Sequence, residues 1–397
     1  MGVAAAAGAA AWRYWPEQGF WNPCHADLPR RLAGHELVQR AWEGIDPAQV
    51  WDCHSHLIGT GDSGSGIFVN PATGSLLNPG QYARRLFFLN AGCVHDAAEG
   101  SVDRAYVERI QNLVHGLQPG CKLVLFAFER AYDERGEPDA EHTLFHVPDA
   151  YARDVAKRHP GEFEWAASIH PYRKDALAAL EQAKRDGARA VKWLPSAMGI
   201  DPASPKCDRF YEGLRKFELA LITHAGEERA VLGRGAYDFG NPLRLRRALE
   251  AGVRVVVAHC ASIGEDRDLD RGPEGPYVES FSLFLRVFER YPSCYGDISA
   301  MTQVNRAGAA LARVVENEAW HARLLNGSDY PLPGVMPIFS VDYLVSLGMI
   351  EAPAAAVLRE IRLHNPLLFD FVLKRTLRSN GKALAARVFE TRSFFMR

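Results

Sequence analysis

The chain has 397 residues, of which 47% are hydrophobic and 24% charged, close to the averages of folded globular proteins. These proportions exclude intrinsic disorder for most of the chain. Lys and Arg (46) nearly balance Asp and Glu (48), so a nucleic acid or an anionic membrane surface has no electrostatic support as a partner.

Short apolar or β-branched runs alternate with helical stretches, which is typical of a parallel sheet covered by helices. The predicted strands, in chain order, are residues 50–54, 123–128, 163–169, 188–193, 220–224, 253–259, 293–298 and 323–327. Helices such as 174–186 and 242–251 lie between strands, and each ends at a glycine. Eight such units predict an α/β fold, a closed (β/α)8 TIM barrel.

Three segments depart from this regular pattern. Residues 1–45 are predicted to form an N-terminal helical extension, 46–376 the barrel, and 377–397 a C-terminal tail. A long insertion follows the first strand, opens with the glycine-rich segment 59–66, and continues through helical stretches 81–90 and 101–117. Because it follows a strand, it is expected to cover the barrel mouth as a lid or pocket wall, and a flexible surface loop is the alternative.

Two histidines end the first strand. His54 and His56 stand at i and i+2 in the segment Trp51-Asp52-Cys53-His54-Ser55-His56. Alternation along a strand places both side chains on one side, where they can converge on one ion. A polar strand end without a metal is the alternative for this motif taken alone.

Other ligand-type residues stand at the ends of later strands. His224 ends the fifth strand, His259 the sixth, and Asp329 follows the eighth. Barrel active sites are built at the carboxyl ends of the strands, so these side chains are expected to meet at one level. The combination predicts a divalent-metal site, with zinc favoured by the nitrogen-rich donors.

These motifs resemble a known family. Asp-x-His-x-His at 52–56, His-Ala-Gly at 224–226, Ala-His at 258–259 and Gly-Ser-Asp-Tyr-Pro at 327–331 look like the amidohydrolase superfamily, most closely its amidohydrolase-related branch. The resemblance runs from about residue 50 to 366. Ala261 and Ser262 depart from it, because that branch usually has glycines after this histidine.

The resemblance implies one or two ions. Lys192 ends the fourth strand, and in binuclear members a lysine there is carboxylated and bridges two ions. In mononuclear members the position is not needed, and an unmodified lysine could bind an anionic substrate instead. His259 is then either a ligand of a second ion or a group that positions water and polarises the substrate carbonyl.

Charge and geometry suggest a catalytic role for Asp329 as well. An ion held by His54, His56, His224 and Asp329 would make a bound water more acidic, and Asp329 could take its proton and return it to the leaving group. Substrate contacts are expected from His170 and Arg173 after the third strand and from Trp193. The alternatives are a helix cap for the first two and the core for Trp193.

The leading functional prediction is a hydrolase of a C–N, ester or lactone bond in a small polar molecule. The alternatives are a non-oxidative decarboxylase on the same ligands and a catalytically silent ligand-binding barrel. No apolar stretch approaches the roughly 18 to 20 residues of a membrane span. The seven cysteines are widely spaced without a CxxC pair, which favours a reducing, cytoplasmic location over a disulfide framework. Homo-oligomerisation is left open.

Overall fold

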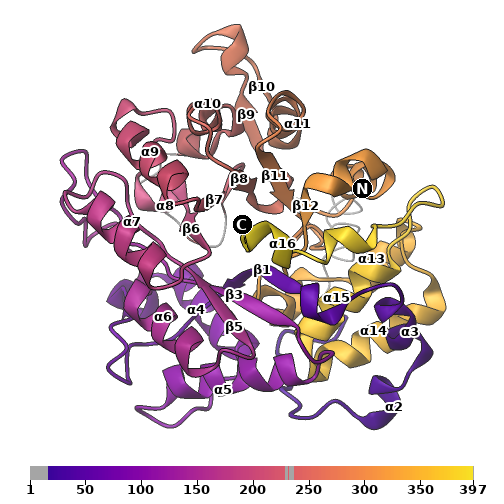
Figure 1. Ribbon diagram of the computed structural model, residues 1–397. Coiled ribbons are helices and arrows are strands. Elements are labelled where there is room, and N and C mark those ends of the chain that lie inside the picture. Colours follow the sequence, from indigo (N-terminus) through magenta and orange to yellow (C-terminus); the bar gives the residue numbers. More distant parts are fainter. Residues whose placement is uncertain (1–16, 229–230, 232–236, 397) are drawn as a thin grey trace, which may run out of the picture.

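Eight parallel strands form the centre of the computed structural model, which describes residues 17–228, 231 and 237–396 (Figure 1). They are β1 (Trp51–His56), β3 (Lys122–Phe126), β5 (Phe163–Ala166), β6 (Ala190–Trp193), β7 (Ala220–Thr223), β8 (Val255–Val257), β11 (Cys294–Asp297) and β12 (Leu324–Leu325). Two sheets, β1-β3-β5 and β6-β7-β8-β11-β12, are joined by the isolated bridges Ala167↔Val191 and Ser55↔Tyr330. The strands therefore follow one another around a ring, and the predicted (β/α)8 barrel is confirmed.

Helices surround this ring (Figure 1). They include α6 (Asp149–Arg158), α7 (Ala176–Arg185), α9 (Asp208–Lys216), α10 (Arg246–Glu250), α11 (Ser280–Arg290), α12 (Ala309–Glu316), α13 (Val341–Ser346), α14 (Ala352–His364) and α15 (Pro366–Thr376). The predicted helix 174–186 is α7, which buries Leu180 and Ala183 and is followed by Gly187 at φ +88°. The predicted helix 242–251 is divided into a 3-10 turn (Pro242–Leu245) and α10.

The insertion after β1 is held in place by a carboxylate. It contains β2 (Phe68–Val69), a 3-10 turn η2 (Pro71–Gly74), α4 (Pro79–Ala91) and α5 (Val102–His115), and β2 pairs with β4 (Phe145–His146). The buried Asp103 side chain accepts bonds from Thr60 N, Gly61 N and the hydroxyls of Ser63 and Ser65. The glycine-rich segment is therefore anchored to α5, unlike the flexible surface loop considered as the alternative.

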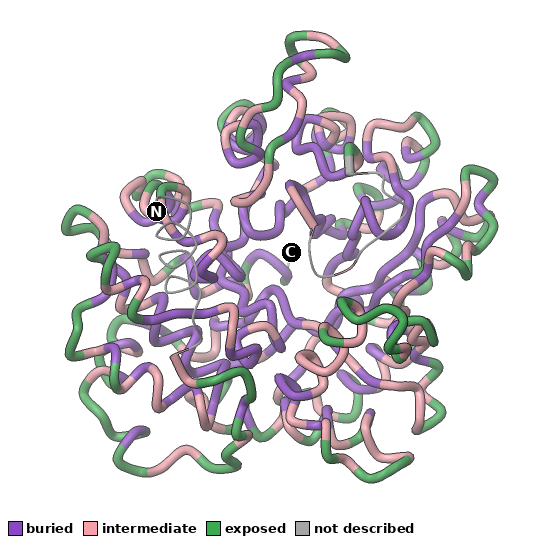
Figure 2. Tube along the Cα trace, turned by 180° about the vertical axis from the view of Figure 1, so that it is seen from behind, coloured by how far each residue is buried: buried purple, intermediate pink, exposed green. Residues whose placement is uncertain are grey.

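The interior of the barrel is filled by apolar side chains. The cluster contains Trp51, Cys53, Val124, Phe126, Ala166, Ala190, Ala220, Ile222, Val256, Leu325, Phe394 and Phe395. The last two belong to α16 (Arg392–Phe395), which lies at the centre of the ring in Figure 1. Phe394 and Phe395 are only 4% and 5% exposed, and Arg254 Nη1 donates to Phe394 O at 2.8 Å. Figure 2 shows the buried strands inside a more exposed outer layer.

The described part of the N-terminal extension contains α2 (Arg30–Ala33) and α3 (Glu36–Trp42). Trp42 stacks on Phe371 of α15, with ring centroids 4.0 Å apart. A disulfide joins Cys24 to Cys93, just beyond α4. The argument against a disulfide framework did not anticipate this pair, because the insertion brings together residues 69 positions apart. The other five cysteines are buried thiols.

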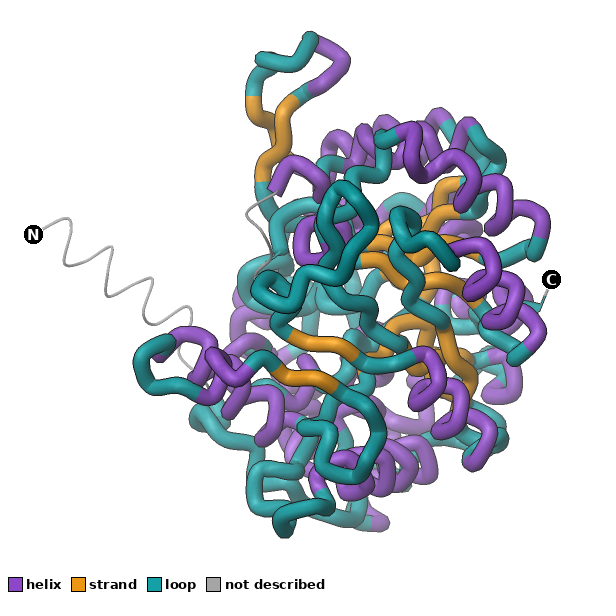
Figure 3. The backbone as a smooth tube through the Cα atoms, turned by 90° about the vertical axis from the view of Figure 1, so that its left-hand side faces the viewer, coloured by secondary structure: helices purple, strands orange, loops and turns teal. Residues whose placement is uncertain are grey.

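One hairpin projects from the barrel. Its strands are β9 (Glu265–Arg267) and β10 (Tyr277–Glu279), which pair antiparallel before α11 (Figure 3). Two further short elements are α8 (Pro195–Met198) and the 3-10 turn Leu332–Gly334. Within the described residues, no helix combines the length and apolar character required to span a membrane.

Candidate metal centre

Three predicted ligands meet at the carboxyl ends of the first and last strands. Asp329 Oδ1 lies 3.0 Å from His56 Nε2 and 3.3 Å from His54 Nε2. Asp52 fixes the two strand ends relative to each other, because its Oδ1 accepts from His54 N and Ser328 N. The donor atoms of His54, His56 and Asp329 all lie within 4.8 Å of one another. Such a cluster of two imidazoles and a carboxylate is suited to a divalent ion.

Asp297, at the end of β11, holds the first of these histidines. Its fully buried carboxylate lies 2.9 Å from His54 Nδ1 and also accepts His259 N at 2.9 Å and Ser299 N at 3.0 Å. Burial raises the pKa of Asp297, but the electrostatic interaction with His54 and its hydrogen bond outweigh it, so the pKa is lowered and the carboxylate stays ionised. It can therefore only accept, so His54 donates from Nδ1 and its lone pair lies on Nε2.

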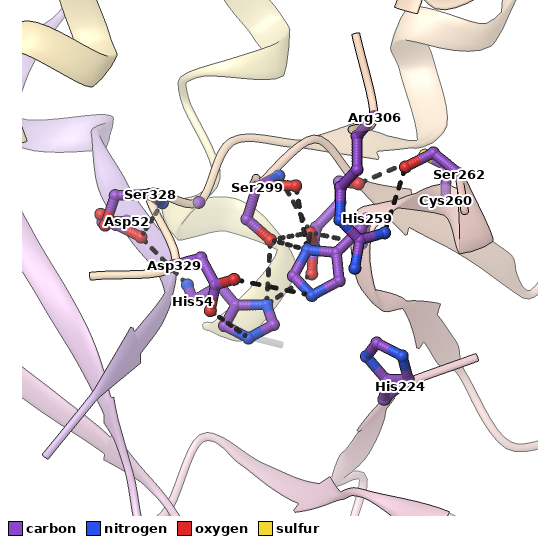
Figure 4. Close-up of polar contacts among 12 residues, drawn as sticks. Asp52, His54, His224, His259, Cys260, Ser262, Ser299, Arg306, Ser328 and Asp329 are labelled. Atoms are coloured by element: carbon purple, nitrogen blue, oxygen red, sulfur yellow. Dashed lines mark hydrogen bonds and ion pairs between the residues drawn. The ribbon is translucent and has the colours of Figure 1, made fainter. Parts of the chain in front are cut away.

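His259 is oriented in the same way. Its Nδ1 lies 2.9 Å from Ser299 O, and Nε2 therefore presents its lone pair 3.7 Å from Asp329 Oδ2. The rings of His54 and His259 are stacked, with centroids 5.0 Å apart (Figure 4). His259, Cys260, Ala261, Ala300 and Asp329 all adopt positive φ angles between 48° and 61°. Such backbone strain in residues other than glycine is concentrated at functional sites.

His224 and Lys192 stand at different distances from the cluster. The Nζ of Lys192, which is 1% exposed, lies 3.1 Å from His54 Nε2. His224 Nδ1 lies 3.4 Å from Glu228 Oε2, and its Nε2 lies 3.3 Å from Glu227 O. Its ring centroid is 5.4 Å from that of His259. The structure thus brings Lys192 into contact with the cluster and places His224 beside it, with its nitrogens against the loop that follows β7.

Burial controls the charges in the cluster. It lowers the pKa of His54 to about 4, and the neighbouring Lys192 charge adds to this effect. Burial raises the pKa of Asp329, but the electrostatic interactions with His54 and His259 and the hydrogen bond from His56 outweigh it, so the net pKa lies well below its ordinary value. A neutral imidazole and an ionised carboxylate are the forms that bind metal ions.

A cavity of about 370 Å³ opens above the cluster. Its walls include His54, His56, Lys192, His224, His259 and Asp329, so all six predicted ligands face it. The insertion contributes Gly59, Thr60 and much of α4, which agrees with the predicted pocket wall. Arg306 also lines the cavity and donates to Ser262 Oγ at 3.4 Å (Figure 4). Ser262, which departs from the family pattern, thus helps to position the guanidinium group of Arg306 at the site.

The three residues predicted to contact substrate do not line this cavity. His170 is fully buried, with Nε2 3.1 Å from Met198 O and Nδ1 accepting from Tyr172 N. Arg173 pairs with Glu129 and Asp175, beside α7. Trp193 donates to Ile169 O at 2.8 Å and packs in the core. Their side chains are engaged in structural contacts, and the prediction does not match their positions.

Comparison with known families agrees with the strand-end motifs. A family profile described as amidohydrolase matches residues 51–367. The chain belongs to the amidohydrolase family. The match includes all six predicted ligands of this family member, as well as Asp297. A search of curated proteins gave no significant match.

Solved structures similar to this amidohydrolase family member are distant in sequence. An uncharacterised TIM-barrel protein from Bordetella bronchiseptica is 16% identical, with 78% of this chain and 98% of that chain covered at a TM-score of 0.48. A putative 2-pyrone-4,6-dicarboxylic acid hydrolase from Pseudomonas putida is 16% identical, with 81% and 97% covered at 0.42. An IDCase from Metarhizium anisopliae is 14% identical, with 88% and 96% covered at 0.44.

Proposed function

We propose that this protein is a metal-dependent hydrolase that cleaves a C–N, ester or lactone bond of a small molecule. The observation that carries the proposal is the common orientation of two histidine rings in the cluster. The Nδ1 atoms of His54 and His259 face acceptors, so the lone pairs of both Nε2 atoms face the ionised Asp329 across the floor of the cavity.

The donor set fits a divalent ion. His54, His56 and Asp329 would hold it, with His224, His259 and Lys192 available for a second ion or for substrate. Neutral imidazoles with one carboxylate favour zinc over the oxygen-seeking ions calcium and magnesium. When bound, such an ion supplies Lewis acidity, which polarises a carbonyl and makes water more acidic.

The chain's own residues supply the proton transfers. Asp329 Oδ1 faces His54 and His56, whereas Oδ2 lies 3.7 Å from His259 Nε2, beyond hydrogen-bond distance. Oδ2 is therefore the atom that takes a proton from the attacking water and returns it to the leaving group. His259 Nε2, beside it, orients the water or the carbonyl. Apolar side chains form most of the cavity wall around these groups.

The same ligands could serve a non-oxidative decarboxylase, which is the second candidate function. A catalytically silent ligand-binding barrel is weakly supported, because it has no use for an ionised carboxylate between two oriented imidazoles. A cytoplasmic location stays a prediction, and the Cys24–Cys93 disulfide weakens the cysteine argument for it.

Metal analysis of the purified protein tests the first half of the proposal. We expect about one or two zinc ions per chain, and we expect His54→Ala/His56→Ala to lose most of them. His115→Ala/His142→Ala is the matched control, because these histidines lie outside the cavity. Zinc content that is undiminished in the first double variant would refute the assignment.

Turnover in ¹⁸O-labelled water tests the second half. Zinc-loaded protein is screened against amides, esters, lactones and aromatic acids. A hydrolase incorporates labelled oxygen into its product, and Asp329→Asn should reduce that turnover by about a hundredfold or more. Release of carbon dioxide with no labelled oxygen in the product would favour the decarboxylase instead.

A further inference from the structure

The cavity is more apolar than a site for a small polar substrate. Apolar side chains form most of its walls, including Phe87, Phe88, Phe128, Phe145, Leu144 and Ile338. Aromatic and aliphatic walls gain free energy by covering an apolar ligand body, at roughly 25 cal/mol per Å² of surface removed from water. A fully hydrophilic substrate would leave this surface without a matching partner.

One face of α4 adds positive charge to these walls. Gln81, Arg84, Arg85 and Phe88 stand at i, i+3, i+4 and i+7, so they project from the same side of the helix, and all four line the cavity. Neither arginine pairs with a carboxylate in the described part of the chain. Arg85 Nε is buried there without a hydrogen-bond partner.

Another part of the cavity wall carries a second unsatisfied donor. Gln303 follows β11, is 5% exposed, and lines the cavity with an Nε2 group that has no hydrogen-bond partner among the described residues. Buried donors normally have partners, because an orphaned one costs free energy. Positively charged side chains outnumber carboxylates in the lining of the cavity. The lining contains the cations Arg84, Arg85, Lys192 and Arg306 and the carboxylates Glu228 and Asp329.

From these observations we propose that the cavity takes an amphipathic carboxylate, whose apolar body packs on Phe88 and its neighbours and whose carboxylate pairs with Arg84 and Arg85. The guanidinium groups belong to the insertion, where Gly74 of η2 leaves room beside Arg85 Nη1. When α4 holds the carboxylate, the other end of the substrate can reach the strand-end histidines. This inference takes only the type of reaction from the proposed function. It adds that the substrate is amphipathic rather than simply polar.

Calorimetric titration of the full chain with 4-phenylbutyrate and its neutral amide, 4-phenylbutanamide, tests the proposal without turnover. We expect the carboxylate to bind about tenfold or more tightly than the amide, the usual effect of a charge-assisted hydrogen bond. Arg84→Gln/Arg85→Gln should abolish most of that ratio. Arg104→Gln, on the exposed side of α5, should preserve it.

Two further experiments test which groups bind the apolar end and the charged end of the probe. Phe88→Ala should weaken both probes and leave their ratio intact, because it removes only apolar contact. Treatment with a chelator should leave the ratio intact as well, because arginines and not an ion hold the carboxylate. Equal binding of the two probes, or no binding of either at millimolar concentration, would overturn the proposal. A ratio of carboxylate to amide affinity that persists in the double arginine variant, or that vanishes with chelator, would overturn it as well. A protein without zinc or turnover that still prefers the carboxylate would contradict the proposed function alone.

Discussion

Asp297→Asn should weaken the candidate metal centre without changing its shape. Asparagine can keep one oxygen on the two backbone amides, His259 N and Ser299 N, which Asp297 accepts at 2.9 and 3.0 Å. Its amide nitrogen then replaces the oxygen that lies 2.9 Å from His54 Nδ1. Two donors cannot face each other, so His54 must move its proton to Nε2, the atom that faces Asp329. The lone pair needed for metal binding is thereby lost.

The expected effect is a loss of about ten- to a hundredfold in zinc affinity, or about 1.4 to 2.8 kcal/mol, the usual effect of removing a partner that orients a ligating histidine. Competition with a chromogenic zinc chelator measures it. Nitrogen chemical shifts of the His54 ring in the metal-free protein should show the proton on Nδ1 before the substitution and on Nε2 after it. An unchanged zinc affinity together with an unchanged tautomer would refute the reasoning.

Three other predictions test the fold around the site. Phe394→Ala should lower the free energy of unfolding in urea by about 3 to 5 kcal/mol, because it opens the filled barrel interior, whereas Leu77→Ala at 91% exposure should change it by less than about 0.5 kcal/mol. Burial raises the pKa of Asp149 to about 7, so its contribution to stability is present below pH 4 and is lost as the pH rises through 7. Asp149→Asn should therefore gain stability relative to the unsubstituted protein between pH 5 and 7, by up to about 2 kcal/mol, and a constant difference would contradict this. Asp103→Ala should speed limited proteolysis within residues 59–66, whose amides and hydroxyls it holds, and unchanged cleavage would show that other contacts suffice.

The sequence allowed all eight barrel strands to be predicted in order, because each is a short, mostly buried run between helical segments. The same logic located His54, His56 and Asp329, since parallel strands end at one level. Asp297 satisfies that criterion too, at the end of β11, but the predicted strand 293–298 extends past it and hides its position at a strand end. A polar residue closing an apolar strand was the available signal.

Contacts between distant segments could not be predicted in this way. Cys24 and Cys93 meet only because the insertion folds back on the N-terminal extension. His170 was predicted to face the pocket because it follows a strand, but Met198 O, at the end of α8, accepts its ring N–H. The burial of Phe394 and Phe395 likewise depends on the barrel they enter, because the tail has no periodic pattern of its own.

The packing of α16 in the barrel interior also determines how molecules can enter and leave the site. Phe394 and Phe395 close one end of the barrel, below Trp51 and Phe126, and the cavity lies at the opposite ends of the strands, under α4. A molecule that reaches His54 and Asp329 and the fragments that leave must then use the same entrance. Two products of one turnover would therefore leave by the opening through which the next substrate enters.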